Sequence, residues 1–199
     1  MKRAFDISAS VLLLLLCWPI LLVIVLVIRI QSPGSAIFKQ VRVGSEGRPF
    51  TCYKLRTMYF GTADLPSHQV QALSVTAFGK YLRYFKIDEF PQLCNVLIGD
   101  MSLVGPRPCL PSQVELVEAR RRLGVLKVRP GITGLAQINN VDMSDASRLA
   151  EIDAQYVRTQ SLKGDLRLIM ATLRGRGIGV DQVAGLNKEP PAKSATLTD

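Results

Sequence analysis

The sequence has one histidine and four cysteines, and this scarcity argues against several kinds of site. His68 lies in a polar Pro-Ser-His-Gln segment typical of a loop, so a catalytic triad or a histidine metal site has little support. The cysteines show no Cys-x-x-Cys pair and no regular spacing, which argues against a zinc site or a disulfide framework. Scattered single cysteines suit a reducing compartment.

Acidic residues are also few, with 16 Asp and Glu against 25 Lys and Arg in 199 residues. A basic surface attracts phosphate-bearing partners, whether nucleic acid, anionic lipid or nucleotide, although a merely soluble basic protein has the same composition. The length predicts one domain with one core, plus an appendage.

The appendage is an apolar run over residues 11–28, preceded by Lys2 and Arg3 and followed by Arg29. As a continuous helix it would measure about 27 Å, just short of the ~30 Å hydrocarbon core. No small-x-small cleavage site follows it, which argues against a signal peptide. Pro19 lies in its middle and removes one helix hydrogen bond.

Two arrangements of this segment stay open: a tilted spanning helix, and a helix-break-helix that enters and leaves one leaflet. The proline and the basic flanks favour the second. Arg3 and Asp6 are helically spaced and are expected to pair at the interface. We divide the chain into a re-entrant membrane helix (1–30), a cytosolic domain on the membrane surface (31–186) and a disordered tail (187–199).

The remaining pattern predicts an α/β fold that is mostly helical with a small β-hairpin. Strands are expected at 37–43 and 50–58, around a Gly-rich turn. Helices are expected at 75–85, from Pro91 to about 97, from a Ser112/Glu115 capping box to 122, at 145–159 and at 162–174. The last helix suits a membrane surface or an ordinary core.

Three basic groups carry two interpretations each. Lys54 and Arg56 are two apart, so they share a strand face that is either solvated or phosphate-facing. The run 120–122 is either a solvated face or a site for anionic lipid. Arg107, bracketed by Pro106 and Pro108, is either part of a rigid connector or an arginine presented to an anion at low entropy cost.

The stretch 86–108 places Asp88 and Glu89 directly before the helix that Pro91 starts. The positive end of that helix favours their ionised forms. A carboxylate needs no base to act as a nucleophile at neutral pH, and Mg2+ prefers one or two carboxylates with phosphate oxygens. Together with Arg107 and Arg83, the two acids would suit phosphoryl chemistry on a diphosphate.

Four motifs together resemble the bacterial monotopic phosphoglycosyl transferases, over nearly the whole chain to about residue 180. They are KRAFD at 2–6, PFTCYKLRTM at 49–58, IDEFPQLCNVLIGDMSLVGPRP at 87–108 and RPGITGLAQIN at 129–139. The size resembles the minimal catalytic form of that family, without the extra membrane domain of larger relatives. The family break at Ser-Pro is Trp18-Pro19 here, so the geometry of the bend stays open, and Asn140 to Met143 also depart from the pattern.

The resemblance implies that Asp88 attacks the β-phosphate of a UDP-sugar and releases UMP. A polyprenyl phosphate, such as undecaprenyl phosphate, then takes the sugar phosphate, at the cytosolic face of the bacterial inner membrane. Asp88 and Glu89 would be the catalytic residues and the Mg2+ ligands. The implied substrate-binding residues are Arg83, Arg107, Lys54, Arg56, Gly131, Thr133, Gly134, Gln137 and Asp153.

Two other functions fit the sequence less well. A membrane glycosyltransferase would release UDP, and a non-catalytic adaptor would use the basic face on lipid or nucleic acid. We expect a UDP-sugar, polyprenyl phosphate and anionic membrane lipid as partners, and no nucleic acid. The sequence leaves open which sugar is transferred, whether the product enters capsule, O-antigen or protein glycosylation, and whether the chain forms a homodimer.

Overall fold

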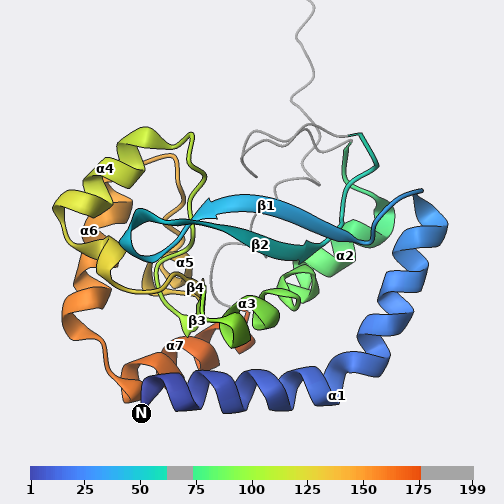
Figure 1. Ribbon diagram of the computed structural model, residues 1–199, viewed down its shortest axis with the longest axis horizontal. Coiled ribbons are helices and arrows are strands. Elements are labelled where there is room, and N and C mark those ends of the chain that lie inside the picture. Colours follow the sequence, from blue (N-terminus) through green and yellow to red (C-terminus); the bar gives the residue numbers. More distant parts are fainter. Residues whose placement is uncertain (62–73, 176–199) are drawn as a thin grey trace, which may run out of the picture.

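The computed structural model describes residues 1–61 and 74–175, and the expectations for His68 and for the tail 187–199 lie outside them. The described chain is mostly helical with two small sheets (Figure 1), which confirms the broad class predicted. The α-helices are α1 (Lys2–Gln31), α2 (Ala77–Tyr84), α3 (Gln92–Ile98), α4 (Val114–Arg122), α5 (Leu135–Ile138), α6 (Ala146–Thr159) and α7 (Leu162–Leu173). The strands are β1 (Ile37–Val43), β2 (Pro49–Leu55), β3 (Ser102–Val104) and β4 (Gly131–Thr133), and the short 3-10 turns include η1 (Ser45–Gly47), η3 (Ile87–Glu89) and η4 (Val125–Lys127).

The first sheet is the predicted hairpin, in which β1 and β2 are antiparallel and Ile37 is opposite Leu55. Its second strand ends at Leu55, three residues earlier than predicted. After Leu55 the backbone leaves β1 for the start of α2, where the carbonyl of Thr57 accepts a 3.0 Å hydrogen bond from the Thr76 amide. The Thr76 hydroxyl caps α2 by accepting from the Gly79 amide at 2.9 Å.

The second sheet joins β3 and β4 in parallel, with Ser102 beside Gly131. The two backbones approach so closely that a Cβ on Gly131 would lie 2.0 Å from the Gly105 nitrogen. Only glycine fits such an approach. The pairing therefore fixes the backbone on which the following Pro-Arg-Pro turn is built.

The capping box predicted for α4 is wrong. The helix begins at Val114, after Gln113, and its N-cap has no side-chain hydrogen bond. The Gln113 Oε1 instead accepts from the Leu110 amide at 2.9 Å and fixes the turn before the helix. The helices over 145–159 and 162–174 have the predicted positions to within one residue.

Helix α1 is continuous for 30 residues, with Pro19 inside it. Figure 1 shows it bent, with its first half beneath the domain and its second half along one side. Proline is a common cause of sharp bends in helices, because its ring clashes with the preceding turn and one hydrogen bond is lost. The helix is therefore bent and not interrupted, unlike the helix-break-helix expected.

Both halves of α1 contribute to the core of the same body. Phe5 and Leu14 pack on a cluster built from β2, α3, β3 and Tyr156. Ile24 and Ile28 pack in a second cluster with Leu55 and Leu82. A third cluster, centred on α4, α5 and α6, does not involve α1.

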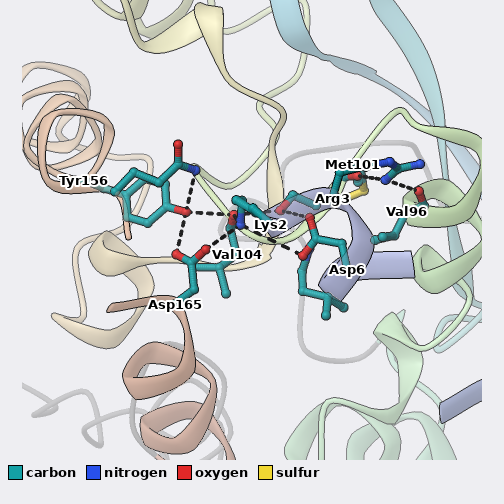
Figure 2. A network of polar contacts seen from close by, with 11 residues as sticks. Lys2, Arg3, Asp6, Val96, Met101, Val104, Tyr156 and Asp165 are labelled. Atoms are coloured by element: carbon teal, nitrogen blue, oxygen red, sulfur yellow. Dashed lines mark hydrogen bonds and ion pairs between the residues drawn. The ribbon is translucent and has the colours of Figure 1, made fainter. Parts of the chain in front are cut away.

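A polar network fixes the first turn of α1 (Figure 2). Lys2 Nζ donates to Asp165 Oδ2 at 2.6 Å and to the Val104 carbonyl at 3.1 Å. The Tyr156 hydroxyl lies 2.9 Å from Asp165 Oδ1 and 3.0 Å from the same Val104 carbonyl. The start of the apolar helix is thereby joined to β3, α6 and α7.

The expected Arg3–Asp6 pair is wrong. Arg3 donates to the carbonyls of Val96 and Leu97 at 2.7 and 3.2 Å, at the negative C-terminal end of α3. Asp6 is buried and accepts from the Ser102 hydroxyl at 2.8 Å. The two charged side chains thus hold α1 to two neighbouring elements.

Candidate active site

The two adjacent acids lie in η3, immediately before α3, as predicted. Lys86, which precedes them, has a left-handed backbone with φ 56°. Such a conformation costs a non-glycine residue about 1 kcal/mol or more and occurs preferentially at functional sites. Pro91 then leads into α3 as its N-cap, so both carboxylates stand at the helix start.

Glu89 is buried and held by two cations. Its Oε1 lies 2.9 Å from Arg107 Nη2 and 3.4 Å from Lys54 Nζ. Burial alone would raise the pKa of Glu89, but Arg107 and Lys54 outweigh that effect and lower the pKa to about 2. Glu89 is therefore a permanently ionised, fixed carboxylate.

Asp88 differs from its neighbour. Within the described residues its carboxylate has no hydrogen bond or ion pair. The nearby charges of Lys54, Arg83 and Arg107 nevertheless act to lower its pKa. Burial, followed by the charge of Glu89, raises the pKa of Asp88 to about 6. At neutral pH Asp88 is mostly ionised, and in the part of the chain that the structure describes no donor engages its oxygens, which suits a nucleophile.

Lys54 and Arg56, which were predicted to share one face of the second strand, contact different parts of the structure. Lys54 reaches Glu89, whereas Arg56 follows the end of β2 and donates to the carbonyls of Ser32 and Pro33 at 2.5 and 2.7 Å. Arg56 thus holds the chain where it leaves α1, because the strand ends one residue earlier.

Arg83 and Lys86 complete the positive charge near Asp88. Arg83 Nε donates to the Thr57 hydroxyl at 2.8 Å, and burial lowers its pKa while Asp88 opposes that shift. Burial likewise lowers the pKa of Lys86, with Glu89 and Asp88 opposing. Sequence reasoning assigned Arg83 to the site and did not assign Lys86, whose proximity depends on the left-handed turn.

The glycine-rich segment 131–134 packs against the backbone of the Pro-Arg-Pro turn. The Gly131 amide donates to the Pro106 carbonyl at 2.9 Å, so this amide is engaged by the backbone and is not available to a substrate phosphate. A Cβ on Gly134 would lie 2.3 Å from the Gly105 carbonyl oxygen, so this residue also serves close backbone packing. Thr133 pairs with the Thr172 hydroxyl at 2.6 Å.

Gln137 has one engaged and one free polar atom. Its Nε2 donates to the Ile132 carbonyl at 3.1 Å, while its buried Oε1 has no partner among the described residues. An unsatisfied buried acceptor is costly, so this atom stays a candidate contact for a substrate.

Asp153 was expected beside the site, but the structure pairs it with Arg120 inside the domain. Arg120 Nη2 lies 2.6 Å from Asp153 Oδ2, and both side chains are almost fully buried. Neither interpretation of the run 120–122, as a solvated face or as a site for anionic lipid, therefore holds for Arg120. The signal was present, since Arg120 lies four residues after the buried Leu116 and shares its helix face.

Two other candidates for chemistry are weaker. Cys52 is buried near the site, and burial raises the pKa of its thiol, which stays protonated at neutral pH. In residues 1–61 and 74–175 no three His, Cys, Asp or Glu side chains gather as a metal site would require. The acids available to a metal ion are Asp88 and its neighbour Glu89.

Comparison with known proteins identifies the family of this chain. Residues 1–176 match the model of a family described as bacterial sugar transferase. The chain is 40% identical over 191 residues to an undecaprenyl-phosphate glucose phosphotransferase of Komagataeibacter xylinus, covering 87% of this chain and 35% of that protein. It is 40% identical over 177 residues to the uncharacterized sugar transferase EpsL of Bacillus subtilis, covering 87% and 86%.

A third relative is a UDP-glucose:undecaprenyl-phosphate glucose-1-phosphate transferase of Caulobacter vibrioides. It is 41% identical over 183 residues, which cover 86% of this chain and 68% of that protein. The chain thus spans about a third of one curated relative and most of the other two. With the family model matched over most of its length, this chain belongs to the bacterial sugar transferases.

Proposed function

We propose that the protein transfers a sugar 1-phosphate from a UDP-sugar to a polyprenyl phosphate and releases UMP. The observation that carries the proposal is the contrast between the two adjacent acids. Glu89 is held by Arg107 and Lys54, whereas Asp88 is ionised at neutral pH and free of protein donors in the described part of the chain. The names of the Komagataeibacter and Caulobacter relatives support this reaction class.

In the first step, an Asp88 carboxylate oxygen attacks the β-phosphorus of the UDP-sugar. The new bond joins aspartate oxygen to phosphorus, and the bond from the β-phosphorus to the bridging oxygen breaks. UMP leaves with that electron pair, and the sugar phosphate stays on Asp88 as an acyl phosphate. No proton transfer is required, which fits a sequence that contains a single histidine.

In the second step, a phosphate oxygen of the polyprenyl phosphate attacks the same phosphorus. The acyl phosphate bond breaks, Asp88 regains its carboxylate, and the product is a polyprenyl diphosphate sugar. A phosphate monoester is substantially ionised near neutral pH, so this nucleophile also needs no base.

The cations around Asp88 have a clear task in both steps. A diphosphate repels an attacking carboxylate unless its charge is neutralised. Arg107 is oriented by Glu89, and Arg83 by Thr57, so each guanidinium is held in place before substrate binds. We assign Arg107 to the nucleotide diphosphate and Arg83 to a phosphate or lipid headgroup.

Mg2+ fits the acids present. Glu89 Oε1 already has two cationic partners, so Asp88 is the main candidate ligand, with Glu89 as its neighbour. Mg2+ commonly takes one or two carboxylates and completes its shell with phosphate oxygens and water. When bound, the ion would neutralise charge on the diphosphate.

We also propose that α1 enters and leaves the same leaflet. Of the described helices, α1 is the one long and apolar enough to cross a membrane. Its two ends nevertheless contact the same body, through Lys2 on Asp165 and through Ser32 on Arg56. A helix whose ends both reach one cytosolic domain cannot place them on opposite sides of a bilayer.

The surface of α1 suits this position. Nine apolar side chains of α1 keep 58–76% of their accessible surface, namely Leu12, Leu15, Leu16, Trp18, Ile20, Leu22, Val23, Leu26 and Ile30. On α7, Leu166, Met170 and Leu173 are also exposed. With Lys163 and Arg167 beside them, these residues suit the cytosolic surface of an inner membrane that contains anionic lipid.

The test is the identity of the nucleotide product. The purified protein, with undecaprenyl phosphate and Mg2+, is given UDP-glucose, UDP-galactose, UDP-N-acetylglucosamine and UDP-N-acetylgalactosamine in turn. The proposal predicts UMP with at least one of them. Release of UDP would identify a glycosyltransferase instead, and no nucleotide release with tight binding to anionic vesicles would favour an adaptor.

A further inference from the structure

The backbone of the Pro-Arg-Pro turn is held by an unusual number of partners. The carbonyls of four consecutive residues each accept a hydrogen bond from a different residue of a distant segment. The donors are Gly131 N to Pro106 O (2.9 Å), Arg120 Nη1 to Arg107 O (2.8 Å), Arg42 Nη1 to Pro108 O (3.1 Å) and Val43 N to Cys109 O (2.9 Å). Strands β1 and β4 and helix α4 therefore all fix this turn.

Arg120 donates to the backbone of Arg107, whose side chain enters the site. Its Nε and Nη2 donate to Asp153 Oδ2 at 3.0 and 2.6 Å, which leaves Nη1 directed at the Arg107 carbonyl. Arg120 and Asp153 are 2% and 1% exposed. Arginine presents its donors in a rigid planar fork, so fixing one edge on Asp153 also fixes the direction of the other.

A buried ion pair is weak evidence for stability, because desolvation of both charges offsets their attraction. Its geometric consequence here is specific. The Arg107 carbonyl belongs to the peptide that joins Arg107 to Pro108, so the hydrogen bond fixes that peptide plane. The Cα–Cβ direction of Arg107 is then fixed too, and with it the reach of its guanidinium to Glu89 at 2.9 Å.

We infer that Arg120, oriented by Asp153, is a positioning residue for Arg107 in the reaction proposed above. It touches neither substrate nor reacting atom, and it acts through the backbone. Misplacing a binding group by about 1 Å can cost up to about a hundredfold in rate. The inference rests on the proposed function, because it assigns Arg107 to the diphosphate.

The decisive variant replaces the pair by apolar groups, as Arg120→Met with Asp153→Leu. Such exchanges of a buried pair are often neutral or stabilising, so α4 and α6 should stay packed. The variant nevertheless lacks the donor to the Arg107 carbonyl. We expect thermal unfolding close to that of the wild type and a kcat/KM for UMP release at least tenfold lower. Full activity in this folded variant would overturn the inference.

A double-mutant cycle shows whether the effect passes through Arg107. Arg120→Lys is measured in the wild type and in Arg107→Lys, with Arg121→Lys as the matched control on the same helix. Arg121 is exposed, and its acidic neighbour Glu118 lies 4.0 Å away. We expect a loss of about tenfold from Arg120→Lys in the wild type and less than twofold in Arg107→Lys, since the two share one route.

An equal loss in both backgrounds would mean that Arg120 only supports the fold, and would overturn the inference. A different failure concerns the proposed function. If the wild type and Arg121→Lys release no UMP with any sugar nucleotide, the reaction itself is wrong and Arg107 has no diphosphate to meet. The wild-type measurement thus separates the two failures.

Discussion

Arg107 Nη2 lies 2.9 Å from Oε1 of Glu89, and this contact distinguishes two adjacent acids that look equivalent in the sequence. Arg107 binds the second acid, whereas the first has no hydrogen-bond donor within residues 1–61 and 74–175. The pKa of Glu89 falls to about 2, while that of Asp88 rises to about 6. Two neighbouring carboxylates with divergent environments are a usual sign of divergent roles.

Replacing Asp88 should abolish activity and yet stabilise the metal-free protein at neutral pH. The folded pKa of about 6 is above the unfolded value of ~3.9, so the native state binds the proton more tightly. The stability that the Asp88 carboxyl contributes is therefore present below about pH 4 and is lost as the pH rises through about 6. Above that, the ionised buried carboxylate is unfavourable, and Asp88→Asn removes it.

The measurement is the midpoint of thermal unfolding of both proteins in EDTA at about pH 7.5 and about pH 4.5. Asp88→Asn should unfold at a higher temperature than the wild type at the first pH, and this gain should shrink markedly at the second. Equal midpoints at about pH 7.5 would mean that the pKa of Asp88 is not raised.

Glycine at 131 should be indispensable to the fold. A methyl group in Gly131→Ala would meet the Gly105 nitrogen at 2.0 Å and push β3 away from β4. We expect a loss of about 2 kcal/mol or more in the free energy of unfolding, or no folded protein. The control is Gly164→Ala in α7, whose new Cβ meets the Ser161 side chain at 3.0 Å and should change stability by less than about 1 kcal/mol.

The ion pair of Lys2 and Asp165 should matter for the seating of α1. Asp165 is buried, and Asp165→Leu would leave Lys2 and the Tyr156 hydroxyl without that partner. Breaking such a pair costs about 3–5 kcal/mol when both charges are buried, and less here because Lys2 is 27% exposed. Chemical denaturation should show the loss.

Glu118→Gln is the matched control for that experiment, because its partner Arg121 is exposed and 4.0 Å away. It should change stability by less than about 0.5 kcal/mol. If both variants lose the same amount, the network in Figure 2 does not anchor the helix.

The bend of α1 should depend on Pro19. Alanine restores the missing hydrogen bond and removes the clash, which favours a straight helix by about 3 kcal/mol. A straight helix of 30 residues cannot reach both Asp165 and Arg56, so one end should detach. In inverted and right-side-out membrane vesicles, a tag on Met1 should be cytosolic in the wild type and partly periplasmic in Pro19→Ala. A periplasmic tag in the wild type would contradict the re-entrant arrangement.

Local features of the fold could be predicted from the sequence where the cause is local. Apolar periodicity placed α6 and α7, and the alternation around a Gly-rich turn placed the hairpin. The adjacent acids and Pro91 gave the centre of the site. The end of β2 could not be predicted, because it depends on the hydrogen bond from the Thr76 amide to the Thr57 carbonyl, between residues far apart in the sequence.

Contacts between residues far apart in the sequence could not be predicted either. A helical pattern alone does not show that Arg3 binds the carbonyls of α3 instead of Asp6, because this contact requires α3 to end beside α1. Arg120 looked solvated because its neighbours in sequence are arginines, yet it lies on the face of Leu116 and meets Asp153. The role of Gly131 likewise appears only once β3 and β4 are paired.

The proposed two-step mechanism depends most directly on a covalent bond between Asp88 and the sugar phosphate. Intact-protein mass spectrometry should detect one added sugar phosphate after incubation with Mg2+ and the productive UDP-sugar, without lipid acceptor. Peptide mapping should place it on Asp88, and undecaprenyl phosphate should remove it. Asp88→Asn should show no adduct. An unmodified wild-type protein under conditions that support turnover, or an adduct on another residue, would contradict the account.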